Sequence, residues 1–186
     1  RAKNMLEYVN ARRGQVEAAM GDLTRKYMTA DKLVKLLAVE VAKTPKLLDC
    51  TPHSVFLGLM QSAACGLPFG RDLAYLIPFE DRKNGKVRAV FIPGYKGMRL
   101  NLIRSGVAVK VEAHVVYKGD EFDYEFGLNP KLVHKRLVEG FEDPTEAWNA
   151  ITHAYAIAWM PNGQYQFTVL PKSYLARIRN SAPGGQ

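Results

Sequence analysis

The sequence is poor in the residues that build disulfide-stapled, metal-bound or membrane-spanning structures. Its 186 residues contain two cysteines, Cys50 and Cys65, which do not form a Cys-x-x-Cys pair. We expect two buried, reduced thiols, because disulfide-stapled domains are smaller and richer in cysteine. No apolar run approaches the roughly 20 residues that a bilayer-spanning helix needs.

Motifs for catalysis are equally scarce. The sequence contains no Gly-x-x-x-x-Gly-Lys-Ser/Thr phosphate loop and no Gly-x-Ser-x-Gly nucleophile motif. The four histidines are scattered, and no two of them lie at the spacing of metal ligands. They are His53, His114, His134 and His153. The lack of a catalytic constellation favours a binding protein over an ATP-driven or hydrolytic enzyme.

One acidic segment, residues 120–126, leaves an enzymatic alternative open. Its carboxylates alternate with aromatic rings, so the two kinds of side chain should face opposite sides of a strand. We expect the rings of Phe122, Tyr124 and Phe126 to lie in the core. The opposite face, with Glu121, Asp123 and Glu125, could gather a divalent ion or meet a basic surface of a neighbouring subunit. A metal-dependent nuclease is therefore the alternative hypothesis, although such sites normally draw carboxylates from separate strands.

The charge of the chain is strongly positive. Lys and Arg number 26 against 18 acidic residues, which gives a formal net charge of +8. Such an excess favours a polyanionic partner, either nucleic acid or an anionic membrane surface. Membrane docking would require a basic amphipathic helix with exposed bulky apolar residues, and the most suitable segment, residues 3–13, is too polar. Nucleic acid is therefore the favoured partner.

Helix signals dominate the N-terminal third. Thr29 is a predicted N-cap for a helix that stops near residues 44–45, and Thr51 followed by Pro52 predicts a second helix that ends at Gly66. We expect residues 1–66 to form an N-terminal helical region. Residues 67–186 should form an α+β DNA-binding core, and the two parts should make one continuous domain.

Strand signals dominate the remainder. Two apolar runs around an Asn-Gly turn predict a β-hairpin, and a helix should follow over residues 95–105. Further strands are expected over residues 107–116, 122–126, 151–159 and 165–170, with a long loop or a short excursion over residues 127–150 and a last helix from Pro171. The fold class predicted by this order is α+β, an antiparallel β-hairpin sheet packed against helices, with N-terminal helices.

Basic residues gather around the hairpin, the helix after it and the last helix. Such a cluster favours a groove that follows phosphates, with aromatic rings free to stack on unpaired bases. Any single residue could equally be a solvated side chain, but the density of the group favours binding. The candidate DNA contacts are Arg71, Lys83, Lys86, Arg88, Tyr95, Lys96, Arg99, Arg104, Lys118, Lys172, Arg177 and Arg179.

An ordered series of segments resembles the RecT family of phage and prophage recombinases. The similarity spans roughly residues 23–182. The segments that carry it are residues 27–33 (YMTADKL), 61–68 (QSAACGLP), 73–79 (LAYLIPF), 92–98 (IPGYKGM), 104–106 (RSG) and 115–122 (VVYKGDEF).

This resemblance implies a function without catalysis. RecT-type proteins bind single-stranded DNA and anneal complementary strands without ATP, so the resemblance implies no enzyme activity and no required cofactor, with Mg²⁺ able to modulate DNA binding. It also implies a distant fold relation to Red-beta and the eukaryotic annealing proteins. DNA contact is carried over to residues 94–98, followed by Arg99 and Arg104.

The resemblance further implies partners and a setting. They are single-stranded DNA, the annealed duplex intermediate, other copies of the chain in a ring or helical filament, and a 5′-to-3′ exonuclease, with no membrane. The setting is the cytoplasm of a bacterial host, with the protein encoded by a phage or prophage. The family continues past Gln186 with a Trp-containing helical segment rich in Lys and Arg, so we expect part of the DNA surface and of the oligomer contact there.

Overall fold

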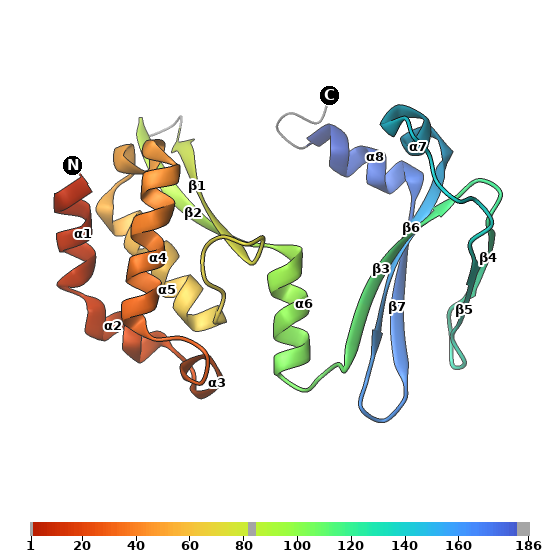
Figure 1. Cartoon of the computed structure of the whole chain (residues 1–186), viewed down its shortest axis with the longest axis horizontal. Helices are drawn as coiled ribbons and strands as arrows, with labels where there is room; N and C mark the ends of the chain where they lie inside the picture. The colour runs from red at the N-terminus through yellow and green to blue at the C-terminus, as the bar shows by residue number, and fades with distance from the viewer. Residues whose placement is uncertain (1, 82–84, 182–186) are drawn as a thin grey trace. The chain divides into compact units, whose positions relative to one another are not determined.

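A computed structural model describes residues 2–81 and 85–181 (Figure 1). The chain divides into two compact units, Arg1–Ser105 and Gly106–Gln186. Both combine helices with antiparallel strands, which confirms the predicted α+β class with N-terminal helices. The division at residue 66 stays a prediction. Across the described ranges, no helix is both long enough and apolar enough to cross a membrane.

The first unit is a group of helices joined to one hairpin (Figure 1). Its elements are α1 (Ala2–Asn10), α2 (Arg13–Ala19), α3 (Asp22–Arg25), α4 (Ala30–Lys43), the 3-10 helix η1 (Pro45–Asp49), α5 (Pro52–Cys65), β1 (Ala74–Asp81), β2 (Lys86–Pro93) and α6 (Tyr95–Arg104). The predicted caps are confirmed. Thr29 Oγ1 accepts a hydrogen bond from the Lys32 amide, and Thr51 Oγ1 accepts one from the Ser54 amide. Gly66 ends α5 in the left-handed conformation, with φ 64°.

The core of this unit lies between α4, α5 and one face of the hairpin. Leu33, Leu37 and Leu59 are fully buried, and Leu76 of β1 packs into the same core. Gly58 of α5 makes room for Leu76, since a Cβ at this position would meet the Leu76 side chain. Successive side chains of a strand point to opposite faces, so the other face of the hairpin points outward.

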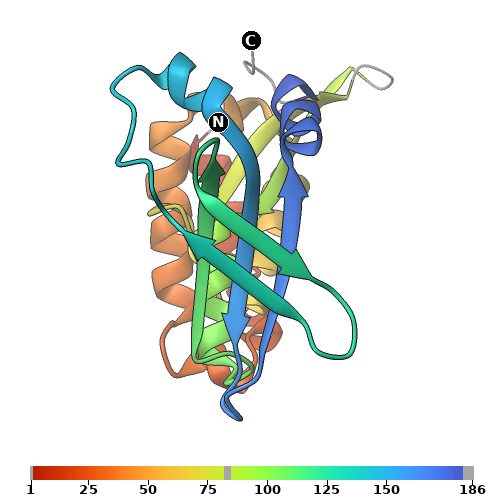
Figure 2. The same ribbon diagram turned by 90° about the vertical axis from the view of Figure 1, so that its right-hand side faces the viewer.

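The second unit is built on an antiparallel sheet with strand order β3-β6-β7, and a two-stranded β4-β5 ribbon crosses one face of it (Figure 2). Its elements are β3 (Lys110–Tyr117), β4 (Glu121–Glu125), β5 (Lys131–Lys135), α7 (Pro144–Ala150), β6 (Ile151–Trp159), β7 (Tyr165–Pro171) and α8 (Lys172–Ser181). Val116, Tyr155 and Ile157 form its small core, against which Phe122 and Leu132 of the ribbon pack.

Some sequence-based expectations about elements and burial differ from the structure. Residues 127–150 are not one long loop, because they contain β5 and α7. The signal for α7 was present, since the Asp143 carboxylate caps the Thr145 and Glu146 amides and Pro144 opens the helix. The strand expected from residue 107 begins at Lys110. Cys65 is exposed rather than buried, because it lies on the outer side of the last turn of α5.

Candidate nucleic-acid interface

Most of the predicted contacts in the first unit are exposed around the start of α6 and on the hairpin. Tyr95, Lys96 and Arg99 project from α6, and Tyr95 has 68% of its surface exposed. Arg71 is exposed on the preceding loop. We call Arg71, Tyr75, Tyr95, Lys96 and Arg99 the α6 edge. Lys86 and Arg88 are exposed on β2, and Lys83 lies outside the described residues.

Two glycines allow the backbone to pack closely at the α6 edge. Gly94 caps α6 and Gly97 lies in its first turn. A Cβ on Gly94 would collide with the Asp72 carbonyl oxygen, and one on Gly97 would collide with the Leu73 carbonyl oxygen. The Gly94 amide donates to the Leu73 carbonyl at 2.9 Å. The loop before β1 therefore lies directly against the first turn of α6, which only glycine permits.

That loop has an unusual backbone. Gly70, Arg71 and Asp72 all have positive φ, at 89°, 53° and 61°. For residues other than glycine this region is sparsely populated, although Asp tolerates it better than Arg. The conformation brings the Asp72 side chain toward α6.

The Asp72 carboxylate is bound at both oxygens. The Tyr75 hydroxyl donates to Oδ1 at 2.8 Å, and Lys96 Nζ donates to Oδ2 at 2.7 Å. The Lys96 bond first, and the Tyr75 bond second, lower the pKa of Asp72 below its ordinary value. The same contact with Asp72 raises the pKa of Lys96. One of the predicted DNA-binding lysines is thus already paired with an anion.

Arg104 is engaged inside the unit. Its guanidinium group lies 4.5 Å from the centre of the Tyr27 ring and donates to the Gly66 carbonyl at 3.4 Å. Asn101 donates to the Cys65 carbonyl at 2.8 Å beside it. These contacts tie α6 to the end of α5. The sequence showed the charge of Arg104 but not this long-range packing.

The predicted contacts of α8 lie against an indole that sequence reasoning missed. The side chains of Lys172 and Arg179 lie over the Trp148 ring of α7, at 5.9 Å and 4.5 Å from its centre. Lys172 also donates to the Asn149 carbonyl at 2.7 Å. Cation–π contacts of this kind stabilise docking of a helix as readily as they bind a ligand. Arg177 lies over Tyr174 within α8, and Lys118 is exposed after β3.

The acidic residues of β4 lie opposite lysines of the neighbouring strand β5. In the β4-β5 register Glu121 lies opposite Lys135 and Glu125 lies opposite Lys131. Within the described ranges, no group of three His, Cys, Asp or Glu side chains is placed to hold a metal ion.

The rings on the other face of this strand are buried only in part. The expected burial holds for Phe122, which packs on the core of the second unit. It is wrong for Tyr124 and Phe126, which are 36% and 64% exposed. The ribbon crosses the sheet at an angle (Figure 2). Phe126 still touches the sheet, because the centre of its ring lies 5.2 Å from that of Phe167 in β7.

A buried polar network lies beneath the ribbon. His134 of β5 bridges the Asp120 carboxylate and the Tyr155 hydroxyl, each at 3.2 Å. Asp120 has no exposed side-chain surface and also accepts hydrogen bonds from the amides of Tyr117, Leu137 and Val138. Burial opposes ionisation, but these donors outweigh it and hold the pKa of Asp120 well below its ordinary value.

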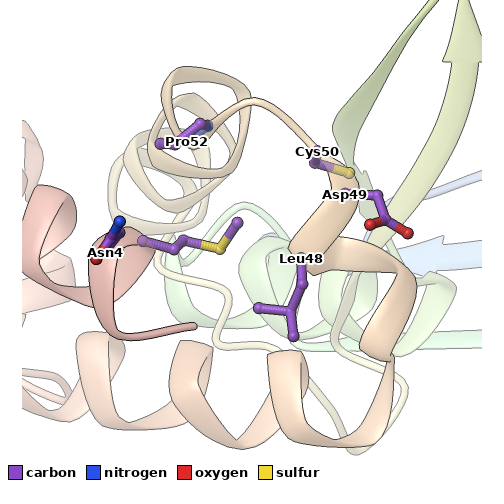
Figure 3. Close-up of a pocket in the computed structure, with 6 residues that line it drawn as sticks. Asn4, Leu48, Asp49, Cys50 and Pro52 are labelled. Carbon is purple, nitrogen blue, oxygen red and sulfur yellow. The ribbon is translucent and has the colours of Figure 1, made fainter. Parts of the chain in front are cut away.

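A separate pocket of about 470 Å³ lies among α1, η1 and α5 (Figure 3). The side chains that line it include Asn4, Leu48, Asp49 and Cys50. Burial, and then the charge of Asp49, raise the pKa of the Cys50 thiol to about 11. A thiol that stays protonated is a poor nucleophile and a poor metal ligand. The raised pKa therefore argues against Cys50 as a nucleophile or metal ligand in this pocket.

Comparison with known proteins agrees with the resemblance found in the sequence. The profile of the RecT family matches residues 31–184. The chain belongs to the RecT family. It is 35% identical over 165 residues to Protein RecT of Escherichia coli (strain K12), an alignment that covers 86% of this chain and 58% of that protein. This RecT-family chain therefore spans somewhat more than half the length of that relative.

Proposed function

We propose that this RecT-family chain binds single-stranded DNA through the α6 edge and anneals complementary strands without ATP. The observation that carries the proposal is the exposure of Arg71, Tyr95, Lys96 and Arg99 around one helix start. Lysine and arginine side chains bind phosphate oxygens through charge-assisted hydrogen bonds, and an exposed ring offers a base a stacking surface.

The proposed mechanism needs no catalytic residue. A protein that grips the sugar-phosphate backbone tolerates any sequence, because base edges are not read. Strands held extended, with their bases accessible, then pair faster than free strands. No cofactor is required in this proposal, and Mg²⁺ acts only by modulating DNA binding.

We also propose that the chain assembles with further copies of itself and works with a 5′-to-3′ exonuclease. The outer face of the hairpin supports self-association, since Ile77, Phe79 and Val90 expose between 37% and 47% of their surfaces. A ring or helical filament in the bacterial cytoplasm, bound first to single-stranded DNA and then to the annealed duplex intermediate, is the proposed working form. The exonuclease would supply the single strands.

Replacing Lys96 and Arg99 together with Ala tests the proposal. We expect weaker binding to labelled single strands of unrelated sequence, by a similar factor for each. The slope of log affinity against log salt should fall in magnitude by about 1.4, because each phosphate that is no longer neutralised lowers it by roughly 0.7. Fluorescence anisotropy across a salt series measures both quantities.

The matched control removes two exposed lysines of α4, Lys35 and Lys43, so the net charge changes equally. The control should change binding much less than the double substitution in α6. An equal reduction of affinity in both variants, or a reduction confined to particular sequences, would count against backbone binding at the α6 edge.

A further inference from the structure

The two donors that hold Asp72 match the needs of a phosphate group. Tyr75 and Lys96 each bind a different oxygen of one carboxylate, at 2.8 Å and 2.7 Å. A phosphodiester also presents two non-bridging oxygens that share a negative charge. A hydroxyl and an ammonium group are common partners of backbone phosphates in DNA complexes.

The carboxylate is presented to these donors by a backbone that is fixed in place. Asp72 has φ 61°, and its carbonyl oxygen lies against Gly94. The amide of Leu73 donates to the Gly70 carbonyl, and the amide of Gly70 donates to the Ala74 carbonyl. These backbone hydrogen bonds do not involve the side chain of Asp72, so its release leaves them in place.

The ion pair itself is weak enough to exchange. The side chains of Lys96 and Asp72 are 48% and 49% exposed. Ion pairs at such sites contribute little to stability, because water screens them and both side chains lose freedom. A polyanion that brings several phosphates at once can displace a single carboxylate.

We propose that Tyr75 and Lys96 form a phosphate subsite that Asp72 fills in the free protein, and that a phosphate of bound DNA displaces the carboxylate. This inference rests on the proposed single-stranded DNA binding. One anion replaces another at Lys96, so no covalent bond is made or broken. Asp72 then acts as an internal competitor that lowers affinity and eases release of the strand.

A double-substitution cycle tests the exchange. Single-stranded DNA affinity is measured by fluorescence anisotropy for Asp72→Asn, Lys96→Met and the double variant. Asn keeps the shape of Asp and tolerates positive φ. With Lys96 present, Asp72→Asn should tighten binding by about two- to fivefold, the range expected when an exposed ion pair no longer competes. In the Lys96→Met background, Asp72→Asn should change affinity little.

Glu80→Gln is the matched control, because it removes one exposed acidic charge from β1, the strand that follows the Asp72 loop. Its effect on affinity should be the same in the wild-type chain and in the Lys96→Met variant. An Asp72→Asn effect that is equally large in both backgrounds would mean simple repulsion and would overturn the exchange. No tightening at all by Asp72→Asn would overturn it too.

The outcomes also separate this inference from the proposed function. Thermal unfolding followed by circular dichroism checks that each variant is folded. If the wild-type chain binds single strands but the effect of Asp72→Asn does not depend on Lys96, only the phosphate subsite is ruled out. No binding of single strands by the wild-type chain at low salt would remove the proposed function, and the subsite with it.

Discussion

The Nε2 atom of His134 lies 3.2 Å from a carboxylate oxygen of Asp120, although 14 residues separate them in the chain. The hydrogen bond joins the β4-β5 ribbon to the turn that follows β3. Three backbone amides also donate to Asp120, so this one carboxylate organises the start of the ribbon. The stability of the second unit should therefore depend on it.

Replacing Asp120 with Ala should destabilise the second unit by about 3 kcal/mol, because buried donors lose a charged acceptor. Both tryptophans, Trp148 and Trp159, lie in this unit, so tryptophan fluorescence during urea unfolding reports on it. Asp123→Ala, on the exposed side of β4, is the control and should change stability by less than about 0.5 kcal/mol. Equal destabilisation of the two variants would contradict the role given to Asp120.

The stabilisation by Asp120 should depend on pH. Its pKa is lower in the folded chain than its ordinary value of 3.8, so the unfolded chain binds the proton more readily. The contribution is therefore fully present above about pH 5 and is lost as the pH falls below about 4. Urea unfolding of the wild type and Asp120→Asn between about pH 3 and pH 7 should show a stability difference that narrows in acid. A difference that stays constant would contradict the lowered pKa.

Gly97→Ala should destabilise the first unit by about 1–3 kcal/mol, because its methyl group would meet the Leu73 carbonyl and the Leu67 side chain. Thermal unfolding by circular dichroism measures the destabilisation, and single-stranded DNA binding should weaken with it. Gly14→Ala in α2 is the control, since no atom lies within 4 Å of its added Cβ. That variant should be as stable as the wild type or more so. A Gly97 variant of equal stability would refute the close approach.

Ser54→Ala should cost about 1–3 kcal/mol, because the buried Ser54 hydroxyl accepts a hydrogen bond from the Ala89 amide at 3.0 Å and links α5 to β2. Hydrogen exchange should show faster exchange of the Ala89 amide. The cap variant Thr29→Ala should destabilise α4 by about 1 kcal/mol and leave that amide protected. If the Ala89 amide exchanges at the same rate in Ser54→Ala as in the wild type, the Ser54 hydroxyl does not protect it.

The two thiols should react at very different rates. Cys65 is exposed, whereas Cys50 is buried with its pKa raised to about 11. A disulfide reagent at about pH 8 should therefore modify one thiol per folded chain quickly and the second only on unfolding. Cys65→Ser should remove the fast reaction. Two fast thiols would place Cys50 at the surface instead.

Local signals in the sequence predicted a large share of the fold. Thr29, Thr51 and Gly66 mark helix ends because a cap hydrogen bond or a left-handed residue satisfies backbone groups within a few positions. The hairpin of β1 and β2 followed from alternation and turn chemistry in the same way. The charged residues of the α6 edge were predicted as DNA contacts from charge density and from the resemblance to the RecT family, and that role stays a prediction.

Contacts between distant residues could not be predicted in this way. Arg104 was assigned to DNA by its charge and by the resemblance, and its contacts with Tyr27 and Gly66 depend on packing that no local pattern encodes. The pairing of Lys96 with Asp72 depends on a positive φ at a non-glycine residue, which the sequence does not signal. The cation contacts of Trp148 need the docking of α8 on α7.

The most direct test of the proposed function mixes the protein with two complementary fluorescent oligonucleotides, without ATP, across a salt series. We predict faster annealing than for the free strands, with the acceleration fading as salt rises and falling in the Lys96 and Arg99 double variant. No acceleration at low salt, in protein that is folded and binds both strands, would contradict annealing by this chain.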